Sequence, residues 1–364
     1  MIRKDEITSL QASLIVAKSM IGTGILFLPQ VMAKEAGTPD GWISVLIGGL
    51  LALLFGYIII KLNGRFPRQT FFEFSQTVFG KAIGAIHIVL LSAYFTISSG
   101  YLTRVMGEVI HMYLLDKTPI SCIILVFMMV GAYLATGGIN PIARFIELFF
   151  PMILIILITL IGFSFQEFEL DNIRPVLGEG FMPVWKGIAS STFAYSGFEI
   201  MLVLSAFMKK PRDAVKSMLT GIGIVIPLYT LTVLISIGTL TVEEVRTLTW
   251  PTMSVAKDIE LPGGFFERFE SLFSVLWVIS MYATFVPYYY VASLGLGHLF
   301  RRNFRTFIYL LFPVIYIIAI FPKKLNDVLS FGSFLNNFAM FVIVIMPIYF
   351  WIFVKLRRKG HENG

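Results

Sequence analysis

Ile21-Gly-Thr-Gly-Ile-Leu-Phe-Leu-Pro29 lies within an apolar stretch that runs from about residue 7 to residue 33. About 20 mostly apolar residues form a helix long enough to cross the hydrocarbon core of a bilayer. Glycine destabilises a helix interior by about 1 kcal/mol relative to alanine, so two glycines within three residues favour local unwinding. Unwound backbone at membrane depth persists only where protein or a cavity surrounds it. The stretch therefore predicts a membrane helix that is broken in its middle.

A second stretch, residues 183–208, has the same character. Its interruption is Phe193-Ala-Tyr-Ser-Gly-Phe-Glu199. The whole chain supports a membrane setting, because 57% of its 364 residues are apolar and only 14% are charged. Soluble domains carry roughly 25% charged residues. The composition predicts an all-α integral membrane protein and excludes a soluble enzyme or a disordered scaffold.

Ten transmembrane helices are expected in a single domain that covers residues 1–364. The predicted spans are 7–33, 41–62, 82–112, 118–137, 142–166, 183–208, 215–240, 269–299, 305–322 and 328–355. One cysteine, Cys122, allows no internal disulfide and no cysteine-based metal site. The four histidines are scattered, and no cluster of acid, base and nucleophile stands out, so we expect no catalytic site, no metal and no cofactor.

The lysines and arginines predict the orientation in the bilayer. With both termini in the cytoplasm, 18 of the 29 basic residues lie on the inner side and eight on the outer side. An excess of basic residues in cytoplasmic loops is the general rule for membrane proteins. The net charge of +7 is therefore a topology signal, without the basic stripe that nucleic acid requires.

Dividing the ten spans into five and five puts the two interruptions at equivalent positions, in the first and the sixth span. A matched pair of glycine-interrupted helices indicates a binding site at the membrane midplane in transporters built from inverted repeats. The alternative is that these glycines are contact points between packed helices. We favour the site, because both interruptions also carry hydroxyl groups.

The expected chemistry of this site follows from the backbone. The N-terminus of a half-helix offers free N–H groups and a positive dipole end to an anion, here from Thr23 and Gly24. Carbonyl groups would accept hydrogen bonds from an ammonium group. The carbonyls expected to do so belong to Met20, Ile21, Phe193 and Ala194. This arrangement fits a small zwitterion, that is, a free amino acid.

Other polar side chains within the spans are candidates for a role at the site. Lys18 either pairs with an acid or extends toward the inner interface. Glu199 latches a helix, carries a proton or forms a purely structural hydrogen bond between helices. Ser280, Thr284 and Tyr288 share one helix face, and Ser280 or Thr284 is a candidate for holding a cation near the first break. Two structural ion pairs are also expected: Arg104 with Glu108, and Arg144 with Glu147.

Both interruptions resemble the first and sixth helices of amino acid/polyamine/organocation transporters, which share the LeuT-type fold. Within that superfamily the chain resembles the B subunit of GerA-type spore germinant receptors. The motifs that carry this resemblance are Thr38-Pro-Asp-Gly-Trp42, Arg174-Pro-Val-Leu-Gly-Glu-Gly180, Trp250-Pro-Thr252 and Glu267-Arg-Phe-Glu-Ser271.

The resemblance implies a nutrient sensor in the spore inner membrane that acts with A and C subunits to start germination. Its ligand would be a germinant such as alanine, and the family's pocket positions correspond to Gly22, Ser98, Ser196, Thr284 and Tyr288. The complete predicted ligand-binding set is Gly22, Thr23, Gly24, Ser98, Tyr195, Ser196, Gly197, Thr284 and Tyr288. Candidate ion-binding or gating residues are Lys18, Glu199 and Ser280.

Two other functions use the same fold. An ion-coupled amino acid permease would use the pocket for alternating access, and an ion-conducting component would pass cations after activation. Fold alone does not separate these functions, because function belongs to the site.

Overall fold

The computed structural model describes residues 5–259 and 269–362, with side chains up to Lys355. Every named element in these ranges is helical. The α-helices are α1 (Ser9–Met20), α2 (Gly24–Ala36), α3 (Gly41–Asn63), α4 (Phe71–Tyr113), α5 (Ile120–Thr136), α6 (Ile139–Ser164), α7 (Met182–Ala194), α8 (Met201–Leu204), α9 (Ala214–Thr247), α10 (Pro251–Asp258), α11 (Phe269–Leu299), α12 (Phe304–Ile320), α13 (Leu325–Met340) and α14 (Met346–Glu362). Short 3₁₀ segments cover Leu170–Ile173, Phe198–Ile200, Ser205–Phe207 and Pro211–Asp213, and a π-helical segment, Phe341–Ile345, joins α13 to α14. The sequence motif at 267–271 begins outside the described residues.

The helices match the hydropathy of the chain. Six of them are long and apolar enough to cross a membrane, and up to eight crossings result if each of two bent pairs counts as one. Two further apolar helices, α5 and α12, have 17 residues each. Each of the ten apolar stretches thus lies on a helix or a bent pair, and the number of crossings stays a prediction.

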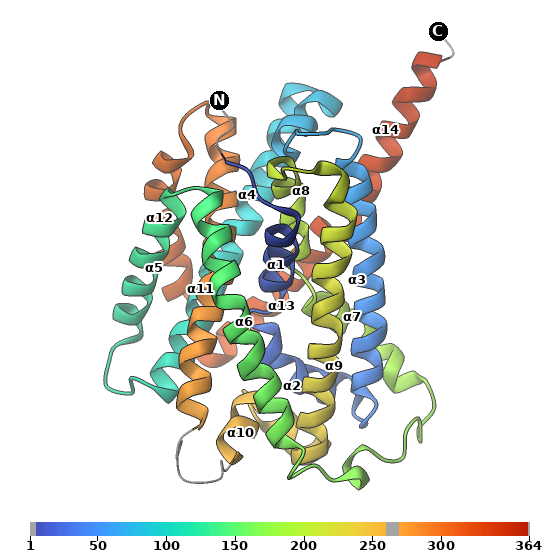
Figure 1. Ribbon diagram of the computed structural model, residues 1–364, viewed down its shortest axis with the longest axis vertical. Helices are drawn as coiled ribbons and strands as arrows, with labels where there is room; N and C mark the ends of the chain where they lie inside the picture. The colour runs from blue at the N-terminus through green and yellow to red at the C-terminus, as the bar shows by residue number, and fades with distance from the viewer. Residues whose placement is uncertain (1–4, 260–268, 363–364) are drawn as a thin grey trace.

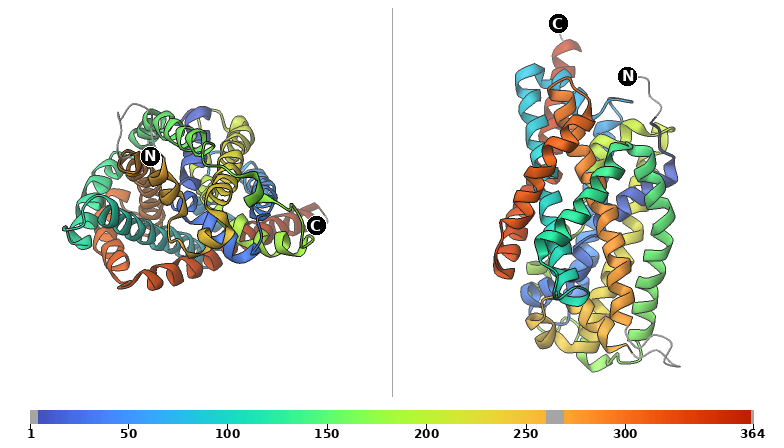
Figure 2. Two further views of the ribbon diagram at one scale, coloured as in Figure 1. Left: turned by 90° about the horizontal axis from the view of Figure 1, so that it is seen from below. Right: turned by 90° about the vertical axis from the view of Figure 1, so that its left-hand side faces the viewer.

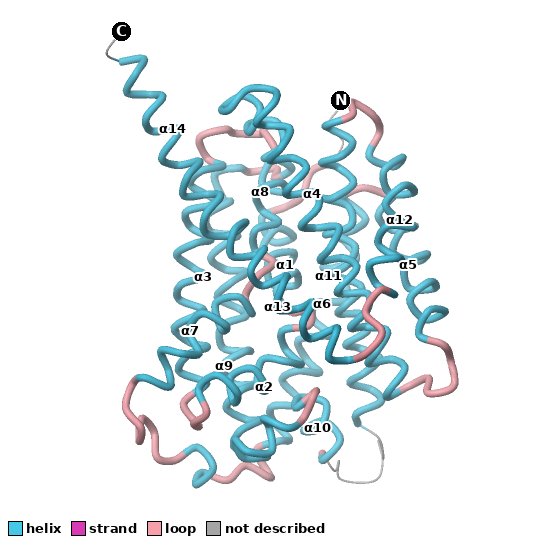
Figure 3. Tube along the Cα trace, turned by 180° about the vertical axis from the view of Figure 1, so that it is seen from behind, coloured by secondary structure: helices cyan, strands magenta, loops and turns pink. Residues whose placement is uncertain are grey.

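The two expected interruptions are confirmed. The axis bends by 48° between α1 and α2 and by 41° between α7 and Phe198–Phe207. Both breaks lie inside the bundle, whereas most other loops gather at its two ends (Figure 3). The backbone therefore changes direction where the glycines lower helix stability.

The helices lie side by side in one elongated bundle (Figure 2). The end of α14 lies at the same end of the bundle as the α5–α6 and α11–α12 connections, and α10 lies at the opposite end (Figure 1). In the predicted orientation, the α10 end is the outer side.

The first broken helix is surrounded by other helices. The side chains of α1 are buried without interruption from Ala12 to Met20. Its neighbours include α6, α9 and α11, and those of α2 include α3, α7, α9 and α10. A helix that is buried on every face belongs to the core of a bundle. By contrast, α5 exposes Val126, Met129 and Tyr133, as expected for a helix at the lipid-facing periphery.

Candidate functional site

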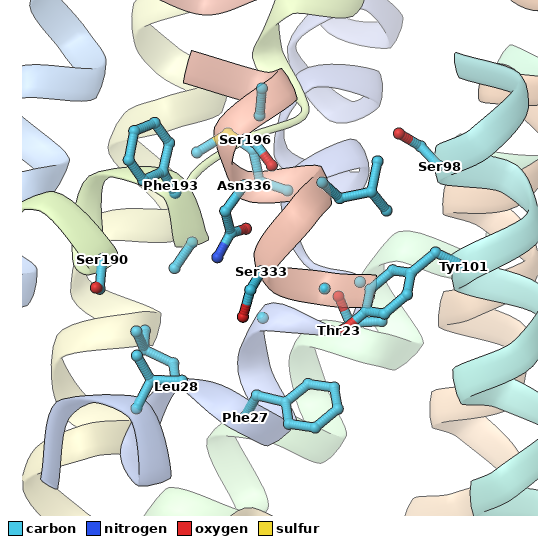
Figure 4. A pocket seen from close by; sticks show the side chains of 18 of the residues that line it. Thr23, Phe27, Leu28, Ser98, Tyr101, Ser190, Phe193, Ser196, Ser333 and Asn336 are labelled. Carbon is cyan, nitrogen blue, oxygen red and sulfur yellow. The ribbon is translucent and has the colours of Figure 1, made fainter. Parts of the chain in front are cut away.

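A cavity of about 580 Å³ lies next to both helix breaks. Its wall comes from the breaks themselves and from α4, α11 and α13. It includes seven of the nine predicted ligand-binding residues: Gly22, Thr23, Gly24, Ser98, Ser196, Thr284 and Tyr288. Figure 4 shows Thr23, Ser98 and Ser196 converging on this space from three separate parts of the chain. Residues that are far apart in sequence therefore meet where the helices are broken.

The start of α2 leaves backbone donors unused. The N–H groups of Leu26 and Phe27 bond to the carbonyl of Thr23, at 3.0 and 3.4 Å, and so close the first turn. Among the described residues, no acceptor bonds to the N–H groups of Thr23 and Gly24. Free amides at a helix N-terminus, together with the positive dipole end, form a binding position for an anionic group.

Two glycines are required here for steric reasons. A Cβ atom on Gly24 would lie 2.5 Å from the hydroxyl of Tyr229. Gly197 has a φ of 133°, and a Cβ there would lie 2.4 Å from the carbonyl oxygen of Ser19. Only glycine adopts that φ without strain. The second break therefore rests directly on the C-terminal end of α1.

The expected carbonyl acceptors need a correction. The carbonyl of Met20 accepts from the hydroxyl of Tyr229 at 2.5 Å, and that of Ile21 accepts from Lys18 and from Ser280. The Phe193 carbonyl accepts from the backbone N–H of Ser196 at 2.9 Å. The expectation that these carbonyls are free for a ligand was wrong, because side chains and turns near the breaks already supply donors.

Two acceptors in the cavity wall are still available. Within the described part of the chain, the carbonyl of Ala194 receives no hydrogen bond, and the hydroxyl of Ser19 has no partner although that residue is only 3% exposed. Buried polar groups normally have a partner, so an unpaired one indicates a missing ligand or water. Both residues line the cavity.

Lys18 is completely buried beside the first break. Its ammonium donates to the carbonyl of Ile21 and to the hydroxyl of Ser280, the latter at 2.5 Å, and lies 3.5 Å from the hydroxyl of Thr284. Among the side chains that the structure describes, no carboxylate lies within 4.0 Å of this ammonium. Both expected roles, pairing with an acid and extension to the interface, were therefore wrong. Lys18 and Ser280 instead fasten the first break to α11.

Glu199 closes the second break. Its carboxylate accepts from the hydroxyl of Tyr94 and from the backbone N–H of Gly197, both at 2.6 Å. The side chain is fully buried. Glu199 therefore joins the break to α4 by a hydrogen bond between helices, whereas a role in carrying a proton stays a prediction.

Two predicted ligand-binding residues lie outside the cavity wall. Tyr195 points away from it and donates to the carbonyl of Val45 on α3 at 3.1 Å. Gly197 is covered by the end of α1. Both belong to the turn at the second break, whereas Tyr288 does line the cavity, with its hydroxyl 3.5 Å from the Ser19 carbonyl.

The contribution of α13 to the cavity was not predicted from the sequence. Ser333, Asn336 and Asn337 line the cavity, and Figure 4 shows the side chains of Ser333 and Asn336 on α13. Two adjacent asparagines within an apolar span were the available signal, because polar side chains inside a membrane generally face a cavity or another helix. Within the described residues no group of three histidine, cysteine or acidic side chains is arranged to bind a metal.

Two solved structures share this architecture. The crystal structure of MhsT in complex with L-phenylalanine matches 96% of this chain and 98% of its own, with a TM-score of 0.70 and 12% identity. Mhp1, a nucleobase-cation-symport-1 family transporter in a closed conformation with bromovinylhydantoin bound, matches 93% of this chain at a TM-score of 0.63. The expected LeuT-type fold, with its broken first and sixth helices, is confirmed.

Similarity in sequence is much closer to another group. The spore germination protein YndE of Bacillus subtilis is 40% identical over 98% of both chains, and spore germination protein A2 of the same organism is 34% identical over 97% of both. Spore germination protein GerLB of Bacillus cereus is 28% identical over 99% of this chain. Residues 6–328 match the family described as Spore germination protein. The chain belongs to this family: it is a multi-pass membrane subunit of a spore germinant receptor, built on a transporter fold, and not an enzyme.

Proposed function

We propose that the chain is the ligand-binding subunit of its receptor and that it binds a small free amino acid, such as alanine, in the cavity beside the two breaks. The observation that carries this proposal is the pair of unused N–H groups, on Thr23 and Gly24, at the N-terminus of α2. They offer a carboxylate two hydrogen bonds and a favourable helix dipole.

The remaining groups in the wall complement the rest of an amino acid. The free carbonyl of Ala194 and the hydroxyl of Ser19 accept hydrogen bonds from the ligand's ammonium group. Hydroxyls of Ser98 and Ser196 lie around the same space. No charged side chain is needed, because the backbone supplies both the anion and the cation contacts.

Binding at this position acts on the breaks themselves. A ligand that bonds to α2 and to the end of α7 holds two half-helices in one relative orientation. A ligand shifts a conformational equilibrium only through its different affinity for the two states. We propose that this shift is passed to A and C subunits of the receptor and triggers germination in the spore inner membrane, with both termini of the chain on the core side.

An ion-coupled amino acid permease is the second candidate. The observation in its favour is the match in fold to MhsT, which was solved in complex with L-phenylalanine. A putative arginine/ornithine antiporter of Escherichia coli is also 24% identical over 66% of this chain. Uptake of labelled L-alanine into proteoliposomes that contain the chain alone separates the two functions: a permease accumulates the label, and a receptor subunit does not.

The experiment that tests ligand binding is a thermal-shift panel of the twenty amino acids on the purified chain in detergent. A ligand that binds the native state raises the apparent stability by mass action. Gly22→Ala narrows the cavity, because its Cβ would lie 3.2 Å from Thr284, and we expect it to lose the shift. Gly223→Ala on α9 is the matched control, since a Cβ there meets nothing within 4 Å. The absence of any shift, or a shift retained by Gly22→Ala, would count against the proposal.

A further inference from the structure

One backbone hydrogen bond is missing in the first turn of α2. Pro29 lies inside this helix and has no N–H group. It therefore cannot bond to the carbonyl of Ile25, four residues earlier, as other helical residues do. An unpaired buried carbonyl is costly, so a donor from elsewhere is expected to replace the missing one.

Thr252 on α10 supplies this donor. Its hydroxyl donates to the carbonyl of Ile25 at 2.7 Å, and its side chain is completely buried. Most other buried threonines in helices behave differently: Thr103 and Thr232 donate to the carbonyl four residues earlier in their own helix. Thr252 forms its bond between two elements that are 227 residues apart in the chain.

A second contact joins the same two elements. The ring of Trp250, just before α10, lies 4.4 Å from the ring of Phe27, centroid to centroid. Phe27 is part of the cavity wall. Both contacts thus fall on the turn that directly follows Thr23 and Gly24.

The helix that forms these contacts is itself anchored. Besides α2, α10 packs against α6, α9 and α11, which do not belong to the breaks. Five of its eight residues are buried. A hydrogen bond from α10 therefore fixes the first turn of α2 against an independent part of the bundle.

We propose that Thr252 is a positioning residue for the ligand site: its hydrogen bond takes the place of the one that Pro29 removes, and it sets the direction of the free amides of Thr23 and Gly24. The Trp250-Pro-Thr252 motif thereby acquires a role at a site that it does not touch. The ligand part of this inference rests on the proposed function.

The test uses a double-mutant cycle in the ligand-free protein. Four variants are compared with the wild type: Thr252→Val, Thr252→Ser, Pro29→Ala and the double variant Pro29→Ala/Thr252→Val. Hydrogen exchange is measured at the amides of Leu26 and Phe27, whose bonds close the first turn. Thr252→Val should speed exchange by about tenfold, since a carbonyl loses its partner, and Thr252→Ser should not.

The effect of Thr252→Val in the Pro29→Ala variant shows whether Thr252 replaces the hydrogen bond that Pro29 removes. The restored N–H at position 29 bonds to the Ile25 carbonyl, so Thr252→Val should then have no further effect. Thr239→Val, which removes a hydroxyl bonded within α9, is the control and should leave exchange in α2 unchanged. The proposal is overturned if Thr252→Val does not change exchange, or if its effect is the same with and without Pro29.

Binding of radiolabelled L-alanine gives a second readout. The dissociation constant should rise about tenfold in Thr252→Val and return to the wild-type value in Thr252→Ser. Faster exchange with an unchanged dissociation constant would show a purely structural role and overturn the positioning. If the wild type itself does not bind L-alanine, the ligand proposal fails and the exchange cycle alone decides whether Thr252 fixes this turn.

Discussion

At the level of single residues, Lys18 has the least expected surroundings. Among the described residues, a carbonyl and two hydroxyls are the only groups that bind its ammonium, and it connects the end of α1 to α11. A charged group without a counter-ion is costly to bury, so these oxygens must replace the water that it loses. The sequence marked Lys18 as a candidate residue, but two of its three partners, Ser280 and Thr284, lie more than 250 positions away and could not be read from spacing.

Lys18→Ala should destabilise the protein by about 2–4 kcal/mol, because it removes a buried side chain and leaves the Ile21 carbonyl with one donor fewer. Thermal unfolding in detergent measures the change. Lys34→Ala at the cavity mouth is the control, since Lys34 is exposed and its removal should change stability by less than about 0.5 kcal/mol. Equal stability of the two variants would contradict the role assigned to Lys18.

Gly197 gives a second prediction at this scale. Gly197→Ala combines a positive φ with a clash against the Ser19 backbone, whereas Gly37→Ala has only the positive φ of 69° and nothing within 4 Å. We expect a loss of about 1 kcal/mol for Gly37→Ala and clearly more, about 3 kcal/mol, for Gly197→Ala. If the two variants unfold at the same temperature, the second break does not rest on α1 as described.

The two expected ion pairs had different outcomes. Arg104 and Glu108, one helical turn apart on α4, form an ion pair at 2.6 Å, as predicted. The prediction of an ion pair between Arg144 and Glu147 was wrong, because the carboxylate of Glu147 accepts a hydrogen bond from the side chain of Gln11 on α1, at 2.8 Å. Contacts within one helix follow from spacing, whereas a contact between helices depends on packing that local sequence does not encode.

At the level of elements, the positions of the two helix breaks were predictable, but the side-chain contacts that hold the breaks to neighbouring helices were not. Glycines and hydroxyls marked both positions, because they lower helix stability inside an apolar run. The latch of Glu199 to Tyr94 depends instead on how α4 crosses the second break. The kinks at Gly80 and Thr241, with φ values of 81° and 65°, and the π-helical segment before α14 also had no clear hydropathy signal.

The latch predicts non-additive effects on stability. Tyr94→Phe and Glu199→Gln each weaken the hydrogen bonds at the second break, and the double variant should lose less than the sum of the two. The coupling expected for residues in direct contact is about 0.5–3 kcal/mol. Thermal unfolding of the four proteins in the cycle measures it. Strict additivity would show that the two side chains do not act together.

At the level of the whole molecule, the cavity exists only because distant elements meet. Its wall combines the end of α1 with α2, α4, α7, α11 and α13. The sequence indicated all of these elements except α13, whose asparagines reach the cavity only through tertiary packing. The family and the fold were recognisable from motifs. Which carbonyl groups are free and which already accept a hydrogen bond depends on the three-dimensional packing.

Amino acid binding beside the two breaks is tested by comparing a zwitterion with two derivatives that each lack one of its charges. For alanine these are L-alaninamide, which lacks the carboxylate, and N-acetyl-L-alanine, which lacks the ammonium group; calorimetric titration of the purified chain measures all three. In the proposed site the α2 amides bind the carboxylate and the Ala194 carbonyl binds the ammonium, so each derivative should bind at least about tenfold more weakly than L-alanine. Binding of L-alaninamide as tight as that of L-alanine would contradict recognition of the carboxylate by the α2 amides.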